Sequence, residues 1–186
     1  MKTLFKLILL LIVVAAAYVG YTASRKPDQY VYQRTRVITA TPTTLFAQIN
    51  DLHNFNTWSP WAKLDPNARL TFEGPSTGPG ATMYWEGNAK MGKGSMAITA
   101  VQPDQSVTYN LVFEKPMTGT ATSQITLNAI PDSGTRVTWS MTGPSNFFQK
   151  VISVVFNCQR MIEDQYDSGL TNLAAKVEHP TPQGNK

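Results

Sequence analysis

The sequence has a single cysteine, Cys158, and only two histidines, His53 and His179, among its 186 residues. One thiol cannot form an intramolecular disulfide. The two histidines are far apart and have no cysteine or carboxylate neighbours at a spacing typical of zinc ligands. These absences exclude a disulfide-rich fold, and we expect no metal site and no cofactor.

Charged residues make up only 15% of the chain, and they form no basic cluster despite a net charge of +4. Lys2, Lys6, Arg25 and Lys26 flank an apolar N-terminal segment, and one acidic residue, Asp28, follows them. From residue 30 onward, 12 basic side chains therefore stand against 11 acidic ones. Binding to a phosphate backbone needs a concentrated positive surface. We therefore expect no nucleic-acid partner.

One glycine-rich segment lacks a residue that nucleotide binding needs. GNAKMGKG, residues 87–94, nearly matches the pattern G-x-x-x-x-G-K-[ST], but Gly94 stands in place of the metal-binding hydroxyl. The segment also leads into a predicted strand, whereas a phosphate-binding loop leads into the N-terminus of a helix. We interpret it as a hairpin turn.

The chain does have a long apolar run near its N-terminus. No charged residue occurs over residues 7–24, which include the stretch LILLLIVVAAAYVG. As a helix with a rise of 1.5 Å per residue, this run spans about 27 Å, just enough to cross the hydrocarbon core of a bilayer. Lys2 and Lys6 before the run favour a cytoplasmic N-terminus, although Arg25 and Lys26 after it weaken that preference. The run predicts a transmembrane helix with the domain on the extracytoplasmic side.

A cleaved signal peptide is the alternative for this segment. Residues 15–17 and 22–24 offer small side chains at the A-x-A-like spacing of a cleavage site. Cleavage would leave a secreted or periplasmic protein. Because the apolar run is longer than the core of a typical signal, we favour a single-pass anchor. We assign residues 1–26 to this segment, 27–178 to one folded domain and 179–186 to a disordered tail.

The rest of the chain is predicted to form one strand, two short helices and six more strands. Alternating polar and apolar residues, many of them β-branched or aromatic, predict a strand at 30–39. Thr41 and Pro42 predict the start of a helix that ends near residue 50, and a second short helix follows over 52–58. Short turns then separate strands of an antiparallel meander. Their expected ranges are 69–73, 81–86, 93–102, 106–114, 119–129 and 135–142.

A final helix of about thirty residues is predicted over 147–177, because apolar residues recur there at spacings of three and four. Cys158 lies on this apolar stripe, so we expect it to be a buried small side chain. This helix is the only predicted element long enough to cover one face of the sheet. The order therefore predicts an α+β fold in which a curved sheet of about seven strands grips the C-terminal helix. A ligand would fit in the gap between them.

Four segments carry a resemblance to a known superfamily. They are NDLHNFNTWSPWAKLDPN (50–67), GPSTGPGATMYWEGN (74–88), KGSMAIT (93–99) and GTRVTWSMTGP (134–144). With the element order, they resemble the helix-grip fold of the SRPBCC superfamily, which includes START domains, and in particular bacterial proteins labelled polyketide cyclase/dehydrase-like. The resemblance covers about residues 30–177. It implies a hydrophobic cavity, but members carry lipids, quinones or hormones, cyclise polyketides or bind proteins, and they share no catalytic motif.

Aromatic and methionine side chains form the candidate ligand-binding set. Rings offer flat apolar surfaces, and methionine adapts to ligands of varied shape. Strand alternation places several of these residues on the face that should point at the long helix. The candidates are Trp58, Trp61, Tyr84, Trp85, Met96, Tyr109, Phe113, Trp139, Met141, Val155 and Met161. Alternatively, the same side chains are ordinary core.

No residue is assigned a catalytic role, but Glu86, His53 and Tyr109 are the candidates if the domain is an enzyme. Glu86 ends a strand of aromatic and apolar residues, and an inward-facing carboxylate would have its pKa raised by desolvation. Alternation places Glu86 on the same side as Tyr84 and opposite Trp85. It does not decide which of these sides faces the interior.

We interpret the chain as a membrane-associated helix-grip domain that sequesters a small hydrophobic molecule, such as a lipid, a quinone or a polyketide-like ring. Two other classes stay open. One is a cyclase or dehydratase that uses the acid–base groups named above. The other is a protein-interaction module with a filled interior and an exposed aromatic patch around Trp58 and Trp61. The sequence identifies no particular ligand or protein partner.

Overall fold

The computed structural model describes residues 1–179. Its helices are α1 (Lys2–Ser24), α2 (Pro42–Ile49), α3 (Leu52–Trp58), the 3₁₀ helix η1 (Pro60–Lys63), α4 (Phe147–Phe156) and α5 (Cys158–Glu178). Its strands are β1 (Gln29–Ile38), β2 (Arg69–Glu73), β3 (Thr82–Glu86), β4 (Lys93–Gln102), β5 (Ser106–Lys115), β6 (Gly119–Ile130) and β7 (Gly134–Pro144). Apart from His179, the predicted tail at 179–186 lies outside the described residues.

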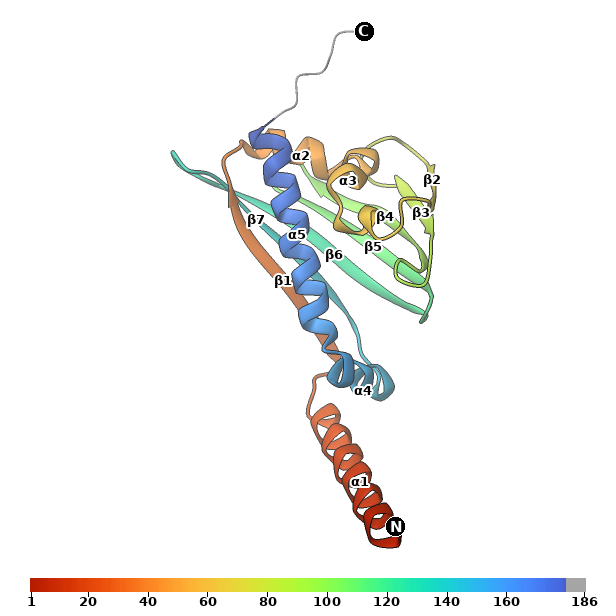
Figure 1. The fold of residues 1–186 in the computed structure, drawn as a ribbon. Helices are drawn as coiled ribbons and strands as arrows, with labels where there is room; N and C mark the ends of the chain where they lie inside the picture. Colours follow the sequence, from red (N-terminus) through yellow and green to blue (C-terminus); the bar gives the residue numbers. More distant parts are fainter. Residues whose placement is uncertain (180–186) are drawn as a thin grey trace.

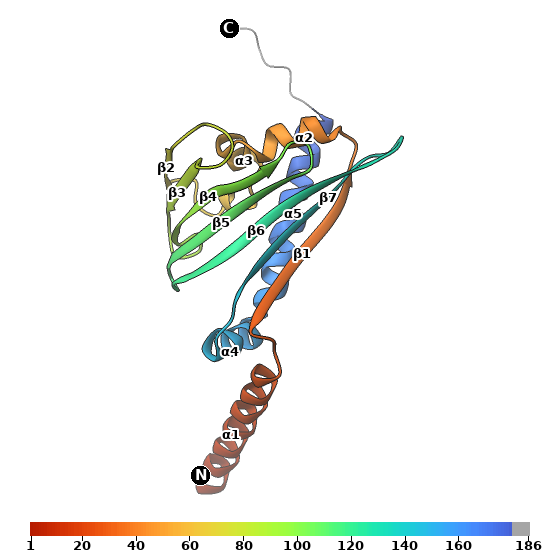
Figure 2. The same ribbon diagram turned by 180° about the vertical axis from the view of Figure 1, so that it is seen from behind.

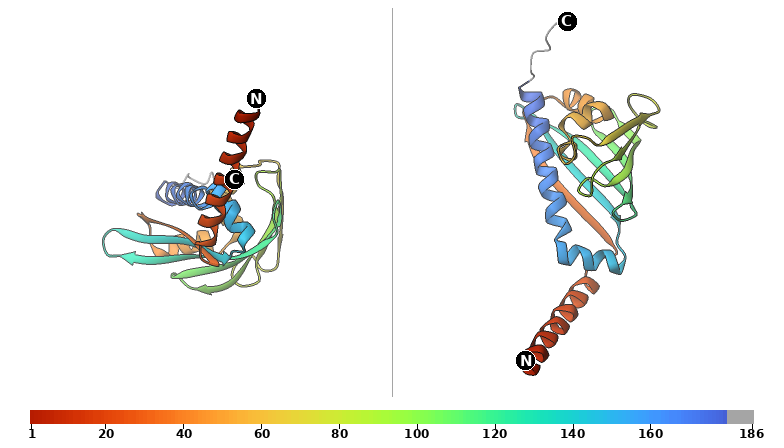
Figure 3. Two further views of the ribbon diagram at one scale, coloured as in Figure 1. Left: turned by 90° about the horizontal axis from the view of Figure 1, so that it is seen from below. Right: turned by 45° about the vertical axis from the view of Figure 1, so that its right-hand side comes forward.

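The strands form one antiparallel sheet in the order β1-β7-β6-β5-β4-β3-β2. β2 to β7 follow the order of the chain, as short turns require. β1 pairs with β7, with Arg34 opposite Trp139. The sheet curls around the side on which α5 lies (Figure 2 and the left panel of Figure 3). The predicted α+β helix-grip order with seven strands is confirmed.

Two short helices close one end of the sheet (Figure 1). Thr41 caps α2 by accepting a hydrogen bond from the N–H of Thr44, and Pro42 occupies the first helical turn. Asp51 caps α3 by accepting hydrogen bonds from the N–H groups of His53 and Asn54. We call this end, which holds α2 and α3, the capped end. The opposite end of the sheet, next to α4, is called the open end.

The C-terminal helix differs from the prediction of one continuous helix over 147–177. Asn157 adopts the left-handed conformation, with φ of 48°, and separates α4 from α5. Asparagine reaches this conformation more readily than most residues because its short polar side chain can bond locally. α4 lies between the domain and the end of α1 (Figure 3). Cys158, at the start of α5, is only partly buried, so the expectation of a buried thiol was wrong.

α5 lies at one side of the sheet, mainly along β1 (Figure 1). Arg34 of β1 holds it there through Glu163, at 2.8 Å, and Asp167, at 2.9 Å. Gly169 is buried where α5 crosses the sheet, and a Cβ at this position would come within 2.7 Å of the Trp139 ring. α5 therefore approaches β7 closely through a glycine. Within the described chain, α5 makes its main contacts with β1, η1 and the helices α2, α3 and α4. It makes no comparable contact with β3, β4 or β5.

Candidate functional site

Aromatic rings from four elements fill the interior beside α3 and η1. Trp139 stacks on Tyr166 with the ring centroids 4.3 Å apart. Phe55, Trp58 and Trp61 meet Trp139 edge-on, at 5.6, 5.4 and 5.5 Å. Such pairs are typical of close-packed cores. Trp58 is 2% exposed and Trp61 is partly buried, so the exposed aromatic patch expected of an interaction module is not found around these two residues.

The indole N–H groups of Trp58 and Trp139 in this aromatic cluster donate hydrogen bonds within the protein. Trp139 Nε1 donates to Ser123 Oγ at 2.9 Å, and Ser123 Oγ donates to a backbone carbonyl of β7 at 3.0 Å. Trp58 Nε1 donates to the carbonyl of Gln48 at 3.2 Å. Burial raises the pKa of Tyr166, so its hydroxyl stays protonated at neutral pH. These groups stabilise a unique packing and leave no basic group free in the cluster.

Tyr109, a candidate for both catalysis and ligand binding, is fully buried on the inner face of the sheet, the face toward α5. Its hydroxyl donates to the carbonyl of Ile49 at 2.6 Å, which ties β5 to the end of α2. Burial raises the pKa of Tyr109 well above its ordinary value. The geometry is that of a structural hydrogen bond.

Glu86 and Tyr84 point away from the interior. In the pairing of β3 with β4, Glu86 lies opposite Lys93, whereas Trp85 lies opposite Gly94 on the inner face. Glu86 Oε2 is 3.8 Å from Lys93 Nζ, and the carboxylate side chain is 56% exposed. The expected alternation is confirmed. The sequence did not decide which side faces the interior, and the structure shows that Tyr84 and Glu86 face outward. Glu86 is therefore a solvated charge on the convex face.

His53 lies on the surface of α3, where its ring stacks on Phe72 at 3.8 Å. His53, Glu73 and Ser76 line a shallow hollow of about 170 Å³. Ser76 lies within a G-x-S-x-G string at residues 74–78, but this string is a loop between two strands, not the strand-to-helix turn of a nucleophile elbow. No hydrogen bond joins these three side chains.

The inner face is less completely buried toward the open end. At the capped end, its side chains are almost inaccessible; they include Ile38, Ile98, Val107, Ile125 and Val137. Toward the open end, buried side chains such as Met96 and Met141 give way to apolar side chains that are only partly buried; these include Tyr30, Tyr32, Trp85, Leu111 and Phe113. An apolar surface with partial exposure therefore extends over β3 and β5, on the part of the sheet that α5 does not cover.

Two glycines shape this surface. A Cβ at Gly94 would lie 2.6 Å from the ring of Trp85, and a Cβ at Gly143 would lie 2.7 Å from the ring of Tyr30. The two rings thus lie flat across neighbouring strands, where a side chain would displace them. A glycine inside a strand marks such close approaches. The predicted ligand-binding set did not include Tyr30, Tyr32, Leu111 and Ile162, which are partly buried apolar residues of the interior.

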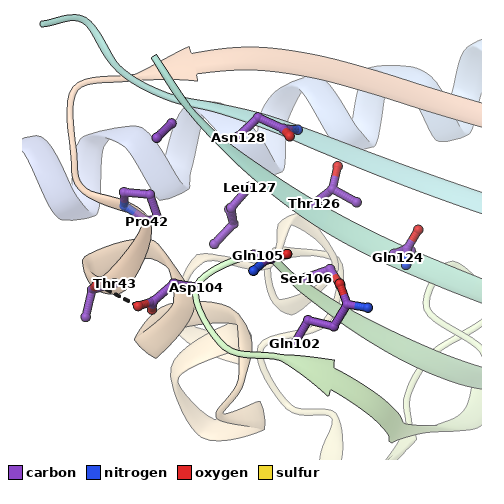
Figure 4. Close-up of a pocket in the computed structure, with 11 residues that line it drawn as sticks. Pro42, Thr43, Gln102, Asp104, Gln105, Ser106, Gln124, Thr126, Leu127 and Asn128 are labelled. Atoms are coloured by element: carbon purple, nitrogen blue, oxygen red, sulfur yellow. Dashed lines mark hydrogen bonds between the residues drawn. The ribbon is translucent and has the colours of Figure 1, made fainter. Parts of the chain in front are cut away.

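Four hollows occur on the surface of the described residues, and one of them reaches Trp85 at the open end. The largest, about 640 Å³, opens between α2, the β4–β5 turn and β6, and most of its lining is polar. Thr43 Oγ1 donates to Asp104 at 3.0 Å at its rim (Figure 4). Another hollow, of about 240 Å³, includes Tyr84 and Trp85 at β3. None of these four hollows is the enclosed apolar gap expected between sheet and helix.

The predicted ligand-binding residues therefore occupy several places. Trp58, Trp61, Tyr109 and Trp139 belong to the packed interior, with Met96 and Met141 also buried on the inner face. Trp85 and Phe113 lie on the open end, where their rings meet edge-on at 6.2 Å. Val155 and Met161 lie on α4 and α5 and are exposed. A role of any of these residues in binding stays a prediction.

Comparison with known proteins places the chain in a family. A family model described as "Polyketide cyclase / dehydrase and lipid transport" matches residues 30–178. The chain belongs to this family. This match confirms the resemblance predicted from the sequence. The N-terminal helix α1 lies outside the matched region. A search of curated protein sequences found no match.

Solved structures share the fold of this polyketide cyclase/dehydrase family member. A protein from Chromobacterium violaceum is 19% identical, with a TM-score of 0.57 over 82% of this chain and 99% of its own. A protein from Mesorhizobium loti is 14% identical, with a TM-score of 0.60 over 82% and 99%. The di-domain ARO/CYC BexL from the BE-7585A biosynthetic pathway is 12% identical, with a TM-score of 0.60 over 87% and 54%. At these identities the likeness concerns the fold alone.

α1 has 23 residues and is long and apolar enough to cross a membrane. Its most apolar stretch is not buried against the rest of the described chain. Helices of this kind near an N-terminus serve as membrane anchors or as signal sequences. Figure 1 shows α1 extending away from the sheet at the open end. The predicted apolar N-terminal helix is therefore present.

Proposed function

We propose that the domain binds a small hydrophobic molecule on the apolar inner surface of its open end and that α1 holds it at a membrane. The observation that supports binding is the partial exposure of Trp85, Leu111 and Phe113 on a sheet face that α5 leaves uncovered. Large exposed apolar surfaces are uncommon on soluble domains unless they contact a ligand or a partner. Sequestration of a lipid, a quinone or a polyketide-like ring would remove this surface from water.

Burial of apolar surface supplies the main driving force for such binding. An apolar ligand that buries about 200 Å² gains about 5 kcal/mol at roughly 25 cal/mol per Å². The loss of translational and rotational freedom offsets part of this gain. The flat rings of Tyr30 and Trp85 offer stacking surfaces for an aromatic or polyene ligand.

The membrane part of the proposal is that α1 remains attached as a single-pass anchor, with the domain on the extracytoplasmic side. Lys2 and Lys6 before the apolar run support this direction. The open end is the end of the sheet nearest to α1 (Figure 1). A hydrophobic ligand could then exchange with the bilayer over a short path. Cleavage after residues 15–17 or 22–24 is the alternative fate of the segment.

A cyclase or dehydratase activity is suggested by the family description, but the candidate groups give it less support than binding. Glu86 faces outward beside Lys93, and His53 lies on the surface. The hydroxyl of Tyr109 is committed to the carbonyl of Ile49. None of these three groups offers a free acid or base to the open end.

Native mass spectrometry of the full chain, extracted in detergent from the membranes of the cells that produce it, tests binding. We expect a reproducible extra mass on the wild-type protein. Phe113→Asp places a charge on the open end, so this variant should lose the extra mass. Tyr84→Ser changes a ring on the outer face of the same sheet and should retain it. An empty wild-type protein, or equal retention in both variants, would contradict the proposal.

A further inference from the structure

α4 turns its apolar side outward. The exposed side carries Phe147, Phe148, Val155 and Phe156, whose exposed fractions are 58, 67, 57 and 69%. The polar residues Lys150 and Ser153 lie on the other side of the helix, and Lys150 is only 7% exposed. A helix on the surface of a soluble domain has the opposite arrangement, with its apolar stripe toward the core. The exposed set of four apolar residues is called the α4 apolar face below.

The polar side of α4 is bonded to the segment that joins α1 to β1. Lys150 Nζ lies 2.6 Å from Asp28 Oδ1, and Lys26 Nζ donates to Ser153 Oγ at 3.2 Å. Ala23, near the end of α1, is completely buried. α4 packs mainly against α1 and the start of α5 rather than against the sheet. The outward direction of the α4 apolar face is therefore fixed by specific contacts.

These contacts place α4 at the level where the apolar run of α1 ends. The run stops at Ser24, followed by Arg25 and Lys26, so the hydrocarbon boundary of a membrane crossed by α1 falls near these residues. Tyr18 and Tyr21 are exposed in the last turns of α1, as aromatic residues at a membrane interface are. Figure 3 shows α4 directly beside this end of α1. The α4 apolar face thus continues the apolar surface of α1.

We propose that α4 is a second membrane contact, which lies in the plane of the bilayer surface with the α4 apolar face among the lipids. This inference rests on the membrane anchoring by α1 that is part of the proposed function. Amphipathic helices at an interface lie roughly 5–10 Å into the boundary between headgroups and acyl chains. α4 holds the domain in one orientation on the bilayer, with the open end toward the lipids.

A fluorescent label on the full chain in phosphatidylcholine vesicles tests the depth of α4. Cys158→Ser removes the native thiol, and Phe148→Cys then takes an environment-sensitive nitrobenzoxadiazole label. Ala175→Cys is the matched control, since Ala175 is exposed near the C-terminal end of α5. Figure 1 shows that this end of α5 lies far from α1. At an interfacial depth of roughly 5–10 Å, lipids brominated near the carbonyl end should quench about half or more of the emission at position 148. The label at position 175 should be quenched by aqueous iodide instead.

Two outcomes would overturn this inference. Quenching of the label at position 148 by iodide and not by brominated lipid would mean that α4 faces water. Protection from both quenchers would mean that a second copy or another protein covers the α4 apolar face. In a further variant, Phe156→Glu should move the label at position 148 into water, while Phe156→Leu should not. Carbonate extraction and native mass spectrometry report separately on α1 insertion and on ligand binding, so failure of α4 docking is distinguishable from failure of the proposed function.

Discussion

The capped end and the open end of one sheet have the same alternating pattern of side chains but differ in what covers them. At the capped end, α3 and η1 bring Phe55, Trp58 and Trp61 onto β7, and α5 adds Tyr166. At the open end, α5 follows β1 and leaves the inner face of β3 and β5 partly exposed. The position of the helices, and not the strand pattern, decides which half is core and which half can bind.

The largest expected effect comes from removing the centre of the capped end. Trp139→Ala should cost about 3–5 kcal/mol of unfolding free energy, because it leaves a large cavity and removes the hydrogen bond that Trp139 Nε1 donates to Ser123. Urea unfolding followed by near-ultraviolet circular dichroism measures this loss. Trp85→Ala removes the same side chain at the open end and should cost clearly less. Equal losses would mean that the two ends do not differ in packing.

The second prediction concerns the approach of α5 to the capped end. Gly169→Ala should destabilise the protein by about 1–3 kcal/mol, because the new Cβ would meet the Trp139 ring and overpack the contact. Ser168→Ala, at the exposed neighbouring position, should change stability by less than about 0.5 kcal/mol. Thermal unfolding of the two variants compares them. A neutral or stabilising effect of Gly169→Ala would show that α5 does not press on β7 as described.

A smaller effect is expected at Tyr109. Tyr109→Phe removes the hydrogen bond to the carbonyl of Ile49 and should cost about 1 kcal/mol. Because this bond belongs to the capped end, bound mass in native mass spectrometry should not change. Loss of the bound mass with unchanged stability would instead assign Tyr109 to the ligand and would move the binding surface into the capped end.

The smallest effect is a pH dependence confined to the open end. The hydrogen bond and charge of Lys150 lower the pKa of Asp28. A carboxyl group with a lowered folded pKa contributes stability that is fully present above its unfolded pKa of about 3.9 and is lost as the pH falls through the folded pKa. The protection factors of the amides of residues 147–156, which correct the exchange rate for its intrinsic pH dependence, should therefore fall in acid below about pH 4. Asp28→Asn should show reduced protection above about pH 4 and the same protection as the wild type in strong acid, and an acid effect that persists in this variant would exclude Asp28 as its source.

The sequence predicted the fold well because its signals are local. Proline and threonine at the start of α2, turn residues between strands and period-two alternation define β1 to β7 almost residue by residue. The break at Asn157 was not predicted, because the apolar spacing of three and four continues through it. The conformation of one asparagine, and not the periodicity, separates α4 from α5.

The candidate site was less predictable because it depends on where α5 lies across the sheet. Alternation placed Phe113 on the correct face but could not distinguish it from Trp139, which is buried by η1 and α5. It did not decide whether Trp85 or Tyr84 faces the interior. Glu86 could be paired with Tyr84 but not assigned to the inside or the outside. The sequence also could not predict that the α4 apolar face is exposed, since an apolar stripe has the same spacing whether protein or lipid covers it.

Labelling with a small apolar diazirine tests the difference between the two ends most directly. The full chain in vesicles is irradiated with the probe, and the modified residues are mapped by peptide mass spectrometry, with α1 as an internal positive control. We predict modification of Trp85, Leu111 and Phe113 at the open end and none of Val107, Ile125 and Trp139 at the capped end. Absence of modification at the open end, or equal modification of both ends, would contradict a binding surface there.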